Sequence, residues 1–84
     1  MIFALDDYVE LHDYPNVIWR VDNPPRFNGG HGLYSLAYVG ADSPNNGERC
    51  RRKLGLSALT FRTHAQGFEL TSANPLLVLA LLSH

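Results

Sequence analysis

The sequence predicts a mainly β domain, a small barrel of five to six short antiparallel strands followed by a short C-terminal helix. Turn-forming residues recur about every ten residues along the 84-residue chain. Between the turns, apolar and polar residues alternate, which is typical of strands with one buried face. Five or six short strands are too few to fill two sheets. We therefore expect residues 1–84 to form one domain with one bent sheet that closes on itself.

The first three expected strands lie near residues 7–13, 16–22 and 33–40. In the first, Val9 and Leu11 face one side while Glu10 faces the other. A long loop rich in glycine, 23–32, separates the second strand from the third. Because a strand and not a helix follows its glycines, this loop is a hairpin loop and not a phosphate-binding loop.

Three more strands are expected near residues 48–54, 57–63 and 67–71. The dipeptide Asn46-Gly47 favours a tight reversal, which would pair 48–54 with 33–40 as a hairpin, and residues 64–67 would join the last two strands in the same way. Alternation along 48–54 would place three cations on one face and Cys50 on the inward face; the cations are Arg49, Arg51 and Lys53.

A helix is expected over residues 74–83. Asn74 can cap it through its side chain, and Pro75 suits the first helical position. The apolar run 76–82 has seven residues, against the ~20 that a membrane-spanning helix needs. This helix has no polar side, so either one side plugs an end of the barrel and its last residues reach water, or its other side meets a second copy of the chain. In the second case the interface residues are Leu76, Leu79 and Leu82.

The stretch 7–21, DYVELHDYPNVIWRV, combines an Asp-x-Val-x-Leu strand with a short loop that contains proline and a second strand. A Tyr-x-Leu strand follows at Tyr34. This pattern resembles the opening of SH3-like small barrels of the Tudor and KOW type, over about the first 40 residues. The chain departs from it at Asp6, where glycine is common, and in the long 23–32 loop. The resemblance implies a fold and not a function, because such barrels host unrelated activities.

The formal net charge of −1 hides an uneven distribution: residues 1–22 carry −4 and residues 26–62 carry +4. Arg49, Arg51 and Lys53 are therefore candidates for binding an anion or a nucleic-acid backbone, with aromatic rings nearby for stacking. Two alternatives remain, pairing with the acids of the N-terminal strands across the sheet and contact with an acidic patch of a protein partner. A dedicated nucleic-acid binder is expected to be basic overall, and this chain is not.

No motif for catalysis, for a metal or for another cofactor is recognisable, so we expect none of them. The four histidines are scattered, and the single cysteine allows no intramolecular disulfide, which favours a reducing compartment. The N-terminus lacks the basic start and the apolar run of a secretory signal. These observations predict a cytoplasmic location.

The functional expectation is a non-enzymatic interaction module that binds a protein partner through the 14–16 and 23–32 loops and forms a homodimer. Loops on a rigid barrel commonly carry recognition. The candidate contact residues are Tyr8, Tyr14, Asn28, His31 and Tyr34. The alternatives are a nucleic-acid-binding barrel that uses the basic strand and, from size and suspected association alone, a small oligomeric enzyme with a site at its interface.

Overall fold

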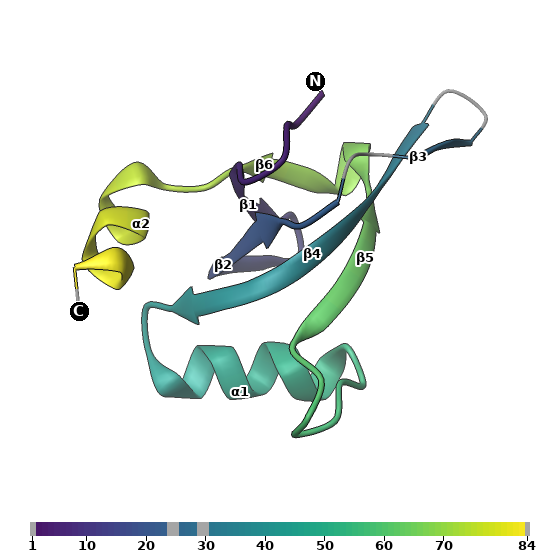
Figure 1. Ribbon diagram of the computed structural model, residues 1–84. Coiled ribbons are helices and arrows are strands. Elements are labelled where there is room, and N and C mark those ends of the chain that lie inside the picture. Colours follow the sequence, from purple (N-terminus) through teal and green to yellow (C-terminus); the bar gives the residue numbers. More distant parts are fainter. Residues whose placement is uncertain (1, 24–25, 29–30, 84) are drawn as a thin grey trace.

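The computed structural model describes residues 2–23, 26–28 and 31–83, with the backbone alone at 26–28 and His31 (Figure 1). It shows the expected mainly β fold, a curled antiparallel sheet with a C-terminal helix. In chain order the elements are β1 (Tyr8–Leu11), β2 (Tyr14–Val21), β3 (Arg26–Asn28), β4 (His31–Ala41), α1 (Pro44–Lys53), β5 (Arg62–Gln66), the 3₁₀ turn η1 (Gly67–Glu69), β6 (Leu70–Ser72) and α2 (Pro75–Leu82).

Strand β4 is the centre of the sheet, because Leu36 and Ala37 pair with β2 on one edge and with β5 on the other. Beyond β2 the order continues through β1 to β6. The two ends of this order, β5 and β6, are separated in the chain by the three residues of η1 alone. The sheet must therefore curl until its edges approach each other. The His12 N–H, which donates to the Glu69 carbonyl at 2.8 Å, fastens this closure.

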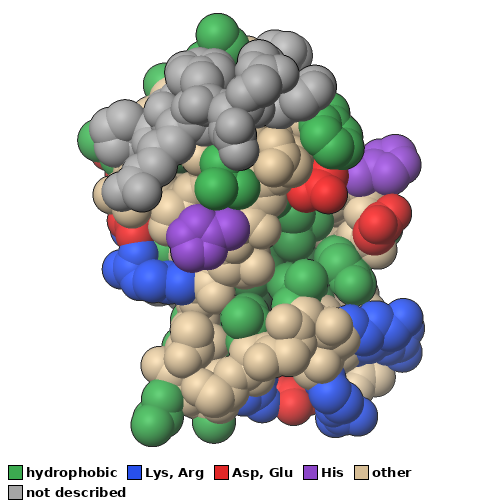
Figure 2. Space-filling model, turned by 90° about the vertical axis from the view of Figure 1, so that its right-hand side faces the viewer, with side chains coloured by type: hydrophobic (Ala, Val, Ile, Leu, Met, Phe, Trp, Pro, Cys, Tyr) green, Lys and Arg blue, Asp and Glu red, His purple; other side chains and the backbone are tan. Residues whose placement is uncertain are grey.

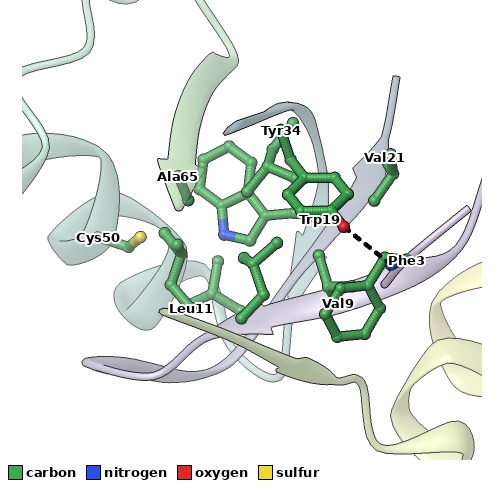
Figure 3. Close-up of a cluster of buried hydrophobic side chains, with 11 residues drawn as sticks. Phe3, Val9, Leu11, Trp19, Val21, Tyr34, Cys50 and Ala65 are labelled. Carbon is green, nitrogen blue, oxygen red and sulfur yellow. Dashed lines mark hydrogen bonds between the residues drawn. The ribbon is translucent and has the colours of Figure 1, made fainter. Parts of the chain in front are cut away.

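The core lies inside the curl, where Val9, Trp19, Tyr34 and Leu36 are almost completely buried (Figure 3). Val9, Leu11 and Tyr34 confirm the predicted alternation on β1 and β4. The Tyr34 hydroxyl accepts a hydrogen bond from the Phe3 N–H at 3.0 Å. The Phe3 ring packs edge-on against the Tyr34 ring, with the ring centroids 5.9 Å apart. These contacts fix the segment before β1 on the core.

The predicted strand 48–54 is wrong, because these residues belong to helix α1 and its end. Ser43 caps α1 by accepting a hydrogen bond from the Asn46 N–H at 3.2 Å, and Pro44 occupies the first helical position. The Asn46-Gly47 pair lies inside the helix and forms no hairpin turn. A helix turns by about 100° per residue, so the stripe of Arg49, Arg51 and Lys53 on one face is also wrong.

The two strands expected after it are shifted along the chain. Strand β5 covers 62–66, so most of the turn expected at 64–67 is strand. In the strand expected at 57–63, Leu59 and Phe61 are 95% and 48% exposed, so these residues face no core. Of the strand expected at 67–71, η1 takes the first three residues and β6 begins at the buried Leu70.

The predicted C-terminal helix is confirmed as α2, with Asn74 as its cap: its side chain accepts from the Leu76 N–H at 3.0 Å. Glu10 ties α2 to the sheet, because its carboxylate accepts from the Asn74 N–H at 3.1 Å and from the Asn16 N–H at 2.6 Å. Leu81 packs on β4 at Gly40. Within the described ranges, no helix is long and apolar enough to cross a membrane.

Candidate interaction groove

The structure separates the five residues predicted to contact a protein partner. Tyr34 lies in the core with 1% of its surface exposed, so its side chain offers no contact surface. Tyr8 and Tyr14 are half-buried, on β1 and at the start of β2. Asn28 and His31 pair with each other across β3 and β4, and their side chains lie outside the described part of the chain.

The three predicted cations are also divided, because they lie on a helix. Arg51 bonds to the Glu48 carboxylate of the preceding turn. This hydrogen bond is the main reason why the pKa of Glu48 is lowered. Arg49 and Lys53, four residues apart, share the other side of α1. Cys50 lies between the two sides and is buried, as expected of a core thiol.

Two hollows follow the turn between β1 and β2. The first, of about 260 Å³, lies between the start of β2 and α1; its walls include Asp13, Tyr14, Pro15, Asn16, Arg49 and Lys53. The second, of about 550 Å³, continues towards η1; its walls include Leu11, His12, Asp13, Tyr14, Leu54, His64, Phe68 and Glu69. Asp13 and Tyr14 line both hollows, so the hollows adjoin at these two residues, and we call the two together the interaction groove.

The β2 wall of the interaction groove is held from two sides. Asn16 has a φ of 67°, a left-handed conformation that asparagine tolerates better than most residues. Its N–H donates to Glu10 and its carbonyl accepts from the Asp42 N–H at 3.1 Å. These bonds keep Pro15 and Asn16 in place opposite α1, which makes this wall a preformed surface.

The α1 wall carries two cations that form no ion pair in the described part of the chain, and Asp13 lines the same hollow. These two cations, Arg49 and Lys53, are exposed. By contrast, Arg20, Arg51, Arg52 and Arg62 each lie against an aspartate or a glutamate. Figure 2 shows several Lys and Arg side chains at the lower right of this face, where α1 lies, with one acidic side chain between them. An anionic group would therefore meet the two unpaired cations at this end of the groove.

A second exposed surface is the outer face of α2. Leu76, Leu79 and Leu82, the predicted interface residues, are 75%, 64% and 54% exposed. They follow one another at intervals of three residues, which places them along one side of the helix. The structure therefore shows the predicted apolar surface, three leucines that the fold itself does not cover.

The sequence reasoning missed the part of the interaction groove that α1 with its C-cap, β5 and η1 build, namely Asn46, Leu54, His64, Phe68 and Glu69. The signal that could have found α1 was Ser43-Pro44, a capping residue followed by proline. In the described segments, no group of three or more His, Cys, Asp and Glu side chains is arranged to hold a metal ion.

Fold and groove together define a small barrel-like β domain with a charged surface groove. No family model, no curated protein and no solved structure matches the chain.

Proposed function

We propose that the chain is a small non-enzymatic interaction module that binds an acidic segment of a protein partner in the interaction groove. One observation carries this proposal: the fold places Tyr14, from the predicted partner-binding set, in the wall of the same hollow as Arg49 and Lys53, from the predicted anion-binding set. Residues that are 35 or more positions apart thus converge on one hollow. The curled sheet with one short turn between its edge strands supports the SH3-like resemblance as part of the proposal.

The chemistry of the groove favours an acidic and partly apolar segment. Carboxylates form charge-assisted hydrogen bonds with arginine and lysine, which are stronger than neutral ones. Tyr14 and the 70%-exposed Phe68 offer ring surface for an apolar side chain further along the same groove. Exposed charges at such a surface act mainly on the association rate and on specificity, so the binding should weaken with salt.

The test uses two fluorescent peptides of equal length, one alternating Glu with Leu and one alternating Gln with Leu. We expect the protein to bind the Glu peptide at least about 10-fold more tightly at low salt, and the double variant Arg49→Glu/Lys53→Glu to lose that preference. The matched control is Arg52→Glu, a charge reversal on the same helix at a residue that does not line the groove. An equal loss in the control would contradict the proposal, because the binding would then reflect net charge.

A nucleic acid is the second candidate for the same hollow, because Tyr14 offers a ring for stacking beside the two cations. An oligothymidylate that contacts two cations should show a modest salt dependence, with a slope near −1.4 on a double logarithmic plot. Binding of the oligonucleotide in preference to the Glu peptide, lost in Arg49→Glu/Lys53→Glu, would decide for this candidate. Retention of the oligonucleotide by that variant would exclude the hollow as its site.

We also propose that the module works as a homodimer joined by the outer face of α2. That face carries three exposed leucines and no charge, so it is complementary to a second copy of itself. Light scattering should give about twice the chain mass of 9.4 kDa at high concentration, and Leu79→Asp should return it to the chain mass. The control Leu59→Asp changes the most exposed leucine outside α2 and should leave the dimer intact. A mass of 9.4 kDa at all concentrations would contradict the dimer.

A further inference from the structure

Strand β5 is an edge of the curled sheet. It pairs with β4 through residues 62–66, and the described part of the chain places no strand on its other side. Figure 1 shows β5 as the outermost strand beyond β4. Such an edge presents backbone N–H and C=O groups that the sheet itself does not use.

The hydrogen-bond pattern shows which backbone groups of β5 point outwards. The Tyr38 N–H donates to the Phe61 carbonyl at 2.8 Å, and the antiparallel register continues from there without a shift to the end of β5. In an antiparallel pair, every second residue bonds to the neighbouring strand and the residues between point their backbone groups away from it. The N–H and C=O groups of Arg62, His64 and Gln66 therefore point away from β4.

One end of this edge is already closed. Glu69, in η1, reaches back so that its carboxylate accepts a hydrogen bond from the Gln66 N–H at 3.0 Å. The other two residues, Arg62 and His64, are exposed. We call these two the open edge, because each can donate and accept one backbone hydrogen bond across it.

The interaction groove runs beside the open edge. His64 is part of the wall of its second hollow, which the turn between β1 and β2 also lines. Leu11, Tyr14 and Leu54 contribute apolar surface to the same hollow. Neighbouring strands lie about 5 Å apart, so a strand added to β5 would run through this part of the groove.

The faces of β5 determine how an added strand would orient its side chains. Ala65 is buried, so Arg62 and His64 carry their side chains on the outer face. Residues directly opposite each other in an antiparallel pair share a face. The added residues that bond to the open edge would therefore point their side chains outwards, and the residues between them would point into the hollow.

Charge distinguishes an acidic partner from a second copy of the chain. If two open edges paired with each other, Arg62 would lie opposite His64 of the other copy, and two basic side chains in such a position are unfavourable. An acidic strand would instead place a carboxylate opposite each of them. Arg49 and Lys53, in the adjoining hollow, favour the same occupant.

We propose that the acidic partner segment binds as an extra antiparallel strand on the open edge of β5, with its acidic residues outwards and its apolar residues in the groove. This inference rests on the proposed function and names the mode of binding. Every strand pair that the structure describes is antiparallel, so the added strand continues the pattern of the sheet. Main-chain hydrogen bonds supply affinity in this mode, and alternate side chains supply specificity.

The first experiment changes the backbone of the peptide that alternates Glu with Leu. In the proposed strand the Glu N–H groups bond to the open edge and the Leu N–H groups point away from it. N-methylation of every Glu removes those donors in any register and should weaken binding at least about 10-fold. The matched control is N-methylated at every Leu and should keep its Kd within about 2-fold of the unmodified peptide. Fluorescence anisotropy at low salt measures all three peptides.

The second experiment changes the open edge itself. Proline has no N–H and is tolerated in edge strands where that group would face outwards. His64→Pro should bind the Glu peptide at least about 10-fold more weakly than His64→Ala, because both variants lack the imidazole and His64→Ala alone keeps the N–H. If His64→Pro does not fold, hydrogen exchange of the wild type locates the strand: saturating peptide should slow exchange of the His64 amide at least about 10-fold.

The results distinguish failure of this inference from failure of the proposed function. If the unmodified Glu peptide does not bind, both are overturned. If it binds and the two N-methylated peptides bind equally, whether tightly or weakly, the added strand is overturned and the acidic segment stands. A loss confined to the peptide methylated at Leu, or unchanged exchange at His64 in the complex, would also overturn the antiparallel strand on β5.

Discussion

The two helices of this domain have opposite compositions and opposite surroundings. Helix α1 is mostly polar, yet it packs against β2 and β4 and buries Gly47 and Cys50. Helix α2 has eight apolar residues, yet none of them is buried. Figure 1 shows α1 beneath the sheet and α2 beside it. The position of a helix on the sheet, and not its overall hydrophobicity, therefore decides how much of it the fold covers.

The comparison assigns different roles to the two helices. Cys50 of α1 belongs to the same core cluster as Trp19 and Leu36, so α1 completes the fold. Helix α2 contacts β4 at Gly40 through Leu81 and leaves three leucines exposed. Leucine side chains that stay exposed do not stabilise the fold, and contiguous exposed apolar surface commonly marks an interface. We therefore expect α1 to govern stability and α2 to govern association.

The largest expected contrast comes from one charge placed in each helix. Cys50→Asp buries a carboxylate without a partner and should cost at least about 3 kcal/mol of the free energy of unfolding. Leu79→Asp adds the same charge at an exposed position of α2 and should change the monomer's unfolding free energy by no more than about 0.5 kcal/mol. Urea unfolding followed by circular dichroism, at concentrations where the chain is monomeric, measures both. Similar losses in the two variants would contradict the division of roles.

A smaller contrast comes from adding one methyl group where each helix contacts the sheet, at Gly47 of α1 and at Gly40 of β4. Gly47→Ala would collide with the Tyr38 hydroxyl, and we expect a net loss of about 1–2 kcal/mol after the gain in helix propensity. In a Tyr38→Phe background the collision is relieved, so the same change should be neutral or stabilising by up to about 1 kcal/mol. Gly40→Ala meets only the end of the Leu81 side chain, at 3.0 Å, and should cost less than Gly47→Ala because α2 is loosely held. A greater loss at Gly40 would reverse the comparison.

The contrast between the helices also explains what the sequence could predict. Strands β1 and β4 follow from alternation, since one side of each faces the core. Helix α2 follows from Asn74-Pro75 and an unbranched apolar run. The sequence predicted a strand in place of helix α1 because Asn46-Gly47 is typical of a hairpin turn. In the structure the same glycine lies inside a helix, where it leaves room for the Tyr38 hydroxyl. That close approach is a tertiary contact, which no local pattern contains.

The interaction groove was predictable only in part. Tyr14, Arg49 and Lys53 were recognisable from the sequence as groups capable of binding. Their position around one hollow could not be predicted, because it depends on where α1 packs against the start of β2. The partner-binding role of Tyr34 fails for a related reason, since its hydroxyl accepts a bond from Phe3, 31 residues away. Binding residues and core residues share the same aromatic side chains, and only the closed sheet distinguishes them.

The smallest expected effect is a dependence of stability on alkaline pH that arises, among the described residues, from Cys50 and Tyr38 at the α1 junction. Burial raises the pKa of Cys50 above its ordinary 9.0 and that of Tyr38 above its ordinary 10.0. The unfolded chain then loses these protons first, so the stabilisation is complete below pH 9 and is lost as pH rises towards the folded pKa values. Cys50→Ala should delay the decline until tyrosine ionises near pH 10. Thermal unfolding at pH values from about 7 to about 10.5 measures this loss of stability. Helix α2 has no titratable group, so Leu79→Ala should keep the wild-type profile, and the same delay in that variant would place the titration elsewhere.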